Sequence, residues 1–129
     1  MTRHRPSKYL PKNDGSPDDQ ERRVARRLGG KKVAGSGSSM YSKGDVRDVS
    51  AISEADSADS VEFLIECKQT IHASLSVKWS WLTKITREAN AVQKEPALAI
   101  EIQGGKNDPM CDRDWVLLPA RTFERLTKG

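Results

Sequence analysis

The sequence predicts an α/β fold in which a mixed β-sheet is flanked by helices. Residues 61–68 form a strongly apolar, alternating run that is typical of a core strand. Residues 75–94 instead repeat their apolar side chains at helical spacing. Shorter apolar segments follow at 97–102 and 115–118, and strands that alternate with helices favour a layered α/β arrangement.

The length and composition predict a single globular domain. The chain has 129 residues, of which 36% are hydrophobic and 31% are charged, so it can bury one core and keep a well-solvated surface. The longest apolar runs are only a few residues, so we expect neither a transmembrane helix nor a membrane partner. The start of the chain also lacks the apolar core of a secretory signal. Two cysteines are too few for a disulfide framework, which favours a reducing, cytoplasmic setting.

Positive charge is concentrated near the N-terminus. Residues 1–32 carry a net charge of +6, whereas the remaining 97 residues carry −2. We expect residues 1–15 to form a flexible basic arm ahead of a single domain at 16–129. The asymmetry suggests a polyanionic partner such as nucleic acid, although a basic tail can also serve only as a solvated segment.

The first predicted helix spans residues 16–28. Ser16 can cap it, Pro17 suits the first helical position, and glycines after Leu28 can end it. We expect Val24 and Leu28 to form its buried stripe.

The segments between this helix and the core strand are less regular. Residues 31–44 are rich in glycine and serine and predict a loop, with a short strand possible at 32–34. Residues 45–52 alternate like a strand, and the polar, acidic residues 53–60 suit a hairpin connection to the core strand at 61–68.

The second half predicts a long helix and two strands. Trp81, Leu82, Ile85, Ala89 and Val92 form the apolar face of the helix at 75–94. Pro96 is expected to end that helix before the strand at 97–102. A loop at 104–113, a strand at 115–118 and a final helix that opens at Pro119 and carries Phe123 and Leu126 complete the chain.

The core strand places a carboxylate and an ammonium group on one face. Because side chains alternate along a strand, Phe63, Ile65 and Cys67 share one side, and Glu66 and Lys68 share the other. Charged groups on a core strand are costly unless they are paired or bind a ligand. A plain surface ion pair between Glu66 and Lys68 is the alternative interpretation.

Asp45 supplies a second carboxylate. If residues 45–52 and 61–68 pair as a hairpin, Asp45 and Glu66 lie at the same end and can converge. Oxygen ligands of this kind suit Mg²⁺, which takes one or two carboxylates and completes its shell with water and phosphate. Such an ion acidifies a bound water and neutralises charge on a phosphodiester.

Glu21 is a candidate third acid. It lies three and seven residues before Val24 and Leu28, on the same face of the first helix. A carboxylate on an apolar face can coordinate the same metal ion, directly or through water, or it can reach solvent from the edge of the stripe.

The order of these residues resembles the PD-(D/E)xK nuclease superfamily, and within it the archaeal and phage Holliday junction resolvases. Glu21, the Gly/Ser-rich segment 35–39, Asp45 and the Glu66-Cys67-Lys68 strand fall in the family's order, followed by a long helix and a further strand. The resemblance covers about residues 18–126. Three features depart from the pattern: a glycine precedes Asp45 where proline is frequent, Asp45 and Glu66 are 21 residues apart, and the basic arm is long.

The resemblance implies a restriction-endonuclease-like core and assigns a role to each residue. Asp45, Glu66 and the Cys67 backbone carbonyl would hold Mg²⁺, or Mn²⁺ as a substitute, with Glu21 as an accessory ligand. Lys68 would act on the nucleophilic water. A serine of the Gly/Ser segment, Ser36 or Ser38, would contact the scissile phosphate, although a plain loop is the other interpretation of that segment. No organic cofactor is implied, and a phage-encoded enzyme would act in the host cytoplasm.

The implied function is a homodimeric, Mg²⁺-dependent endonuclease that resolves four-way DNA junctions to 5′-phosphate products. A two-fold dimer is expected because a four-way junction is cut on two symmetric strands. Two alternatives stay open: a nuclease of other specificity (restriction, repair or nicking), and a DNA-binding protein with a degenerate nuclease fold.

Several residues of the long helix allow two interpretations each. We expect one of Trp79 and Trp81 to be core and the other to lie at a dimer interface or against DNA. Lys78, Lys84 and Arg87 are candidate phosphate contacts or solvated surface.

Overall fold

The computed structural model describes residues 16–33, 44–53 and 56–128 of the chain. The arm at 1–15 and both candidate serines, Ser36 and Ser38, lie outside these residues. The elements in chain order are α1 (Pro17–Leu28), β1 (Lys31–Lys32), β2 (Val46–Ser53), β3 (Asp56–Thr70), α2 (Trp79–Ala91), β4 (Glu95–Ile102), β5 (Asp114–Leu117) and α3 (Ala120–Lys128).

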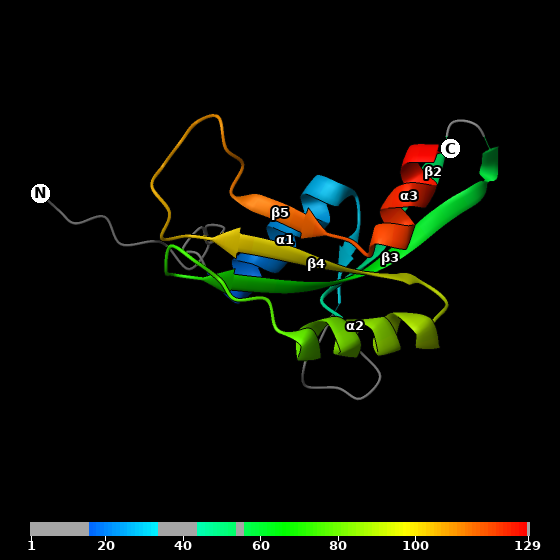
Figure 1. Cartoon of the computed structure of the whole chain (residues 1–129), viewed down its shortest axis with the longest axis horizontal. Coiled ribbons are helices and arrows are strands. Elements are labelled where there is room, and N and C mark those ends of the chain that lie inside the picture. Colours follow the sequence, from blue (N-terminus) through cyan, green and yellow to red (C-terminus); the bar gives the residue numbers. More distant parts are fainter. Residues whose placement is uncertain (1–15, 34–43, 54–55, 129) are drawn as a thin grey trace, which may run out of the picture.

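The described strands form one mixed sheet with the order β1-β2-β3-β4-β5, and helices flank it (Figure 1). β3 and β4 run parallel, whereas the other neighbouring pairs are antiparallel. A parallel pair needs a crossover, and α2 supplies it between β3 and β4. The predicted α/β class is therefore confirmed. No helix among the described residues is long and apolar enough to cross a membrane.

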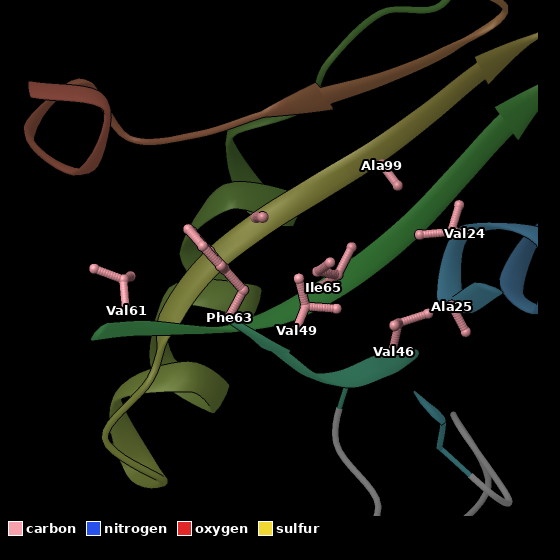
Figure 2. Packing of buried hydrophobic residues seen from close by; sticks show 9 residues of the cluster. Val24, Ala25, Val46, Val49, Val61, Phe63, Ile65 and Ala99 are labelled. Carbon is pink, nitrogen blue, oxygen red and sulfur yellow. The ribbon is translucent and has the colours of Figure 1, made fainter. Parts of the chain in front are cut away.

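The two faces of the sheet carry separate cores. On one face, Val24 and Ala25 of α1 pack with apolar residues of β2, β3 and β4, and Leu126 of α3 packs against the same cluster. Figure 2 shows this cluster running along β3 from Val61 to the end nearest α1. On the other face, Leu64 and Leu98 pack against Ile85 and Ala89 of α2. The predicted division of faces along residues 61–68 is confirmed.

The β2–β3 hairpin is longer than the sequence predicts. Residues 56–60, expected as part of the connection, belong to β3, which also continues to Thr70. Val46 pairs with Ile65, and Val49 pairs with Phe63, so three steps along β2 match only two along β3. Within this bulge Asp48 has a φ of 62°. This bulge turns both Val46 and Val49 towards the same core, although strict alternation places them on opposite faces.

α2 is shorter than the predicted helix. It begins at Trp79, not at Leu75, and ends at Ala91. Val92 therefore follows the helix and is exposed, which corrects its assignment to the apolar face. Pro96 is the second residue of β4, so the helix ends before the proline is reached.

α1 begins and ends as the sequence predicts. The Ser16 hydroxyl accepts a hydrogen bond from the Asp19 N–H at 3.1 Å, and Gly29 ends the helix at a φ of 75°. Leu28, however, is exposed, and the buried face consists of Asp19, Gln20, Val24 and Ala25. Val24 is therefore buried as predicted, whereas Leu28 does not belong to the buried face.

Candidate active site

Asp45 lies at the point where β2 leaves β3. Its backbone N–H donates to the Ile65 carbonyl at 2.8 Å, and Val33 N–H donates to the Asp45 carbonyl at 2.9 Å. Its Oδ2 accepts a hydrogen bond from the Cys67 N–H at 2.7 Å. The buried Asp45 carboxylate therefore binds the backbone of β3 just beyond Ile65, the last β3 residue that pairs with β2. Glu66 lies between these two positions of β3.

The backbone of Cys67 faces the same edge. In a β-strand the N–H and C=O of one residue point to the same side, so the Cys67 carbonyl points to the edge where Asp45 lies. Burial and then the Asp45 charge raise the pKa of the Cys67 thiol far above its usual range. The Cys67 side chain packs against the core that includes Val24 and Ala25, so its backbone is the part of this residue that faces Asp45.

Glu66 and Lys68 point together to the α2 face of the sheet. Lys68 Nζ lies 3.5 Å from Glu66 Oε2, and Lys84 Nζ lies 3.7 Å from Glu66 Oε1. The side chains of Glu66 and Lys68 are 12% and 28% exposed, so the pair is partly buried and differs from the solvated surface pair of the alternative interpretation. Burial and then Asp45 raise the pKa of Glu66, while Lys84 and Lys68 lower it. The geometry agrees with this influence of Asp45, because its carboxylate binds the N–H of Cys67, the residue that follows Glu66.

Trp81 borders the site through Lys68. The Lys68 Nζ lies 4.7 Å from the centre of the Trp81 ring, and Lys78 Nζ lies 5.8 Å from it. Trp81 also packs against the core on the α2 side, whereas Trp79 is 76% exposed. Trp81 is therefore the core tryptophan of the predicted pair, and its ring attracts the ammonium group of Lys68.

Glu21 approaches Asp45 from α1. Its side chain is 15% exposed, and Lys32 Nζ lies 3.6 Å from its Oε1. Burial, followed by the Asp45 charge, raises the pKa of Glu21 to about 7. Glu21 is thus a largely buried acid on which the Asp45 charge acts, and its burial argues against a carboxylate that simply reaches into solvent.

Gln20 is a residue beside the candidate site that the sequence analysis did not single out. It is fully buried, and its Nε2 donates to the Lys68 carbonyl at 2.8 Å and to the Ala99 carbonyl at 3.3 Å. α1 is thereby tied to the backbone of the strand that carries Lys68. Its position four residues before Val24 indicates that Gln20 shares the buried face of the helix.

Glu88 of α2 was also missed. Its Oε1 accepts a hydrogen bond from the Gly44 N–H at 2.9 Å, and its Oε2 lies 3.4 Å from Lys84 Nζ. Its position three residues after Ile85 and one before Ala89 was the signal, because polar residues beside a buried stripe often face a neighbouring element.

The backbone at Gly44 requires a glycine directly before Asp45. Its φ is +74°, and a Cβ added there would lie 2.6 Å from the Leu64 Cγ. Proline, whose φ is fixed near −65° and which has no N–H, cannot adopt this backbone or donate to Glu88. The glycine is required by local geometry in this chain.

The donor set suits a hard cation. Among the described residues, no three His, Cys, Asp or Glu side chains are arranged as a metal-holding group. Mg²⁺, however, commonly binds only one or two carboxylates of a protein and keeps several waters. The carboxylates of Asp45 and Glu66 and the Cys67 carbonyl are oxygen donors, so their chemistry fits this ion.

The candidate phosphate contacts lie at different places. Lys84 borders the acids, and Lys78 lies beside Trp81. Arg87 and Trp79 instead line a groove of about 610 Å³ between α2 and the β5–α3 region, whose lining is mostly apolar and includes none of the acids. Of the three predicted phosphate contacts, Lys84 and Lys78 therefore lie near the acids or Trp81, and Arg87 does not.

Comparisons of the chain with protein-family models, with curated proteins and with solved structures found no match.

Proposed function

We propose that the protein is a metal-dependent endodeoxyribonuclease with a restriction-endonuclease-like core of the PD-(D/E)xK type. The observation that carries the proposal is the placement of Asp45, Glu66 and Lys68 around one short segment of β3, residues 66–68. The Asp45 carboxylate is fixed there by the Cys67 N–H at 2.7 Å, and the Lys68 ammonium lies 3.5 Å from Glu66. Partly buried acids can hold a metal ion that assists phosphodiester hydrolysis, and a neighbouring lysine can orient the attacking water.

In this proposal, Asp45, Glu66 and the Cys67 carbonyl hold Mg²⁺, or Mn²⁺ in its place, and Glu21 is an accessory ligand. When bound, the ion would acidify a water and neutralise charge on the scissile phosphate. Lys68 orients the attacking water, and Glu66 and the Trp81 ring hold its ammonium group in place. Ser36 or Ser38 contacts the phosphate of the cut strand.

The substrate we propose is branched DNA, cut as a four-way junction by a homodimer to give ligatable 5′-phosphate ends. The order of Glu21, Asp45, Glu66 and Lys68 along the chain and the excess of positive charge in residues 1–32 support this choice. A dimer matches a substrate with two symmetric scissile strands.

Two other functions are compatible with parts of this site. A restriction, repair or nicking enzyme keeps the same chemistry on a linear duplex. A binding protein with a degenerate site keeps DNA affinity without cleavage, but the chain retains both acids and the lysine, which favours an enzyme.

A substrate comparison separates these functions. The protein is incubated with a labelled four-way junction and with a linear duplex of matched sequence, each with Mg²⁺ and with a chelator. We expect paired symmetric nicks in the junction only, in Mg²⁺ only, that a ligase can seal.

Equal cutting of both substrates would keep the nuclease and exclude junction selectivity. Binding that persists in chelator, with no cutting of either substrate in Mg²⁺, would contradict the proposal in favour of a binding protein.

A further inference from the structure

Glu88 contacts the site through the residue that precedes Asp45. Its side chain is largely buried, and its two oxygens have separate partners: Oε1 accepts the Gly44 N–H at 2.9 Å, and Oε2 lies 3.4 Å from Lys84 Nζ. Because it is buried close to Glu66, its charge adds to the local repulsion and raises the pKa of Glu66 after the effects of burial, Asp45 and the two lysines. A further acid in this place therefore needs a compensating role.

The bond to Gly44 restrains the entry to β2. Gly44 has a left-handed φ, and residue 45 is fixed on its far side by the hydrogen bonds to Ile65 and Cys67. α2 thus holds the chain directly before Asp45, while β3 holds it at Asp45 itself. A shift of the Gly44 peptide would rotate the backbone that carries the Asp45 carboxylate.

We infer that Glu88 is a positioning residue. Its Oε1 accepts the Gly44 N–H and so fixes the Asp45 carboxylate at the edge of β3. The inference rests on the proposed function, in which Asp45 is a metal ligand. Only an acceptor at this place is needed, and the negative charge of Glu88 is not. This distinguishes the role from that of a further metal ligand, for which the charge and both oxygens matter.

Two nearly isosteric variants separate these roles. Glu88→Gln keeps an acceptor for the Gly44 N–H, whereas Glu88→Met fills the same space without one. Lys84→Met is the control for Gly44 exchange alone, because it removes the partner of the other Glu88 oxygen and leaves the bond to Gly44 in place. Its kcat decides nothing about Glu88, since Lys84 also lies 3.7 Å from Glu66 Oε1. For each variant, amide hydrogen exchange at Gly44 and the kcat and KM of Mg²⁺-dependent junction cleavage are measured, after circular dichroism has verified its fold.

We expect Gly44 exchange to remain slow in Glu88→Gln and in Lys84→Met, and to become about tenfold faster or more in Glu88→Met. We expect kcat to fall by about 10- to 100-fold in Glu88→Met, with KM changed by less than about threefold, because a small misplacement of a reacting group costs rate more than binding. Glu88→Gln should restore most of the lost kcat.

Equal losses of kcat in Glu88→Gln and Glu88→Met would overturn the inference, because the charge would then be what matters. Unchanged Gly44 exchange in Glu88→Met would also overturn it. If Glu88→Met does not fold, Glu88→Gln decides: slow Gly44 exchange with retained kcat supports the role, and loss of either contradicts it. A wild-type protein that cuts no DNA would defeat the proposed function, whereas Gly44 exchange would still report on the Glu88 contact.

Discussion

Glu21 is a carboxyl group whose surroundings favour its protonated form. Burial and the neighbouring Asp45 raise its pKa from 4.5 to about 7, although Lys32 opposes the shift. In the folded protein Glu21 therefore holds a proton that the unfolded chain releases as pH rises above 4.5. The free energy of unfolding must fall over this interval, because the folded state binds more protons than the unfolded state.

Replacing Glu21 with glutamine should remove this destabilisation. In metal-free protein at pH 8 we expect Glu21→Gln to raise the free energy of unfolding by about 1 to 3 kcal/mol, from the size of the pKa shift. Below about pH 4 the gain should vanish, because both states of the wild type are then protonated. Urea denaturation in chelator at several pH values measures the difference. A gain that does not vary with pH would contradict the raised pKa.

The sequence predicts the residues of the site whose partners are near in sequence or follow a known pattern. Glu66 and Lys68 share a face because they are two residues apart on a strand, and Asp45 reaches them because its strand pairs with theirs. Gln20 and Glu88 were missed because their partners, Lys68 and Gly44, are 48 and 44 residues away. A polar side chain beside a buried stripe looks the same in sequence whether it meets water or a backbone group.

At the scale of elements, α1 is docked by an ion-pair network. Arg23 donates two hydrogen bonds to Asp114, at 2.8 and 2.7 Å, and its Nη2 lies 3.2 Å from Glu101. Arg27 binds Asp112 at 3.0 and 2.7 Å. These pairs connect α1 to β4 and to the start of β5, and so hold in place the helix that carries Gln20 and Glu21.

The two arginines should differ in their effect on stability. The Arg23 side chain is 25% exposed and its partners are largely buried, whereas Arg27 and Asp112 are both 48% exposed. We expect Arg23→Met to lower the free energy of unfolding by about 2 to 4 kcal/mol, because it leaves buried carboxylates without a partner. Arg27→Met should cost less than about 1 kcal/mol. Urea denaturation of both variants tests this, and equal losses would contradict it.

The elements themselves follow from local patterns, but their ends do not. The cap at Ser16 and the glycine at 29 fix α1 from sequence alone. The extension of β3 down to Asp56 could not be predicted from the sequence. Its polar residues show no strand pattern of their own, and their strand conformation depends on backbone pairing with β2. The bulge at Asp48 likewise depends on the packing of Val46 and Val49 against one core.

At the scale of the whole molecule, the candidate site forms where α1, the entry to β2 and α2 approach β3. α1 contributes Glu21, the entry to β2 contributes Asp45, and α2 contributes Lys84 and Glu88. The α/β class was predictable because it depends on periodicity and order. The junction substrate and the dimer stay predictions, since they depend on surfaces that no short motif specifies.

The basic arm provides a prediction for DNA affinity. Residues 1–15 contain four lysines and arginines and one aspartate. If they bind DNA phosphates, their deletion should weaken junction binding and flatten the dependence of log K on log salt by about 0.9 for each phosphate that the arm neutralises. Fluorescence anisotropy at several salt concentrations measures the slope. An unchanged slope would show that the arm does not bind DNA.

The most direct test of the central claim is the rate of junction cleavage as a function of Mg²⁺ concentration in the wild type and in Asp45→Asn. Glu124→Gln, which changes an exposed acid of α3 away from the site, is the matched control. We predict Mg²⁺-dependent cleavage by the wild type and by the control, and a loss of at least about 100-fold in Asp45→Asn, as expected when a group that supports catalysis is removed. Cleavage by Asp45→Asn at the wild-type rate would contradict the assignment of the active site to Asp45, Glu66 and Lys68.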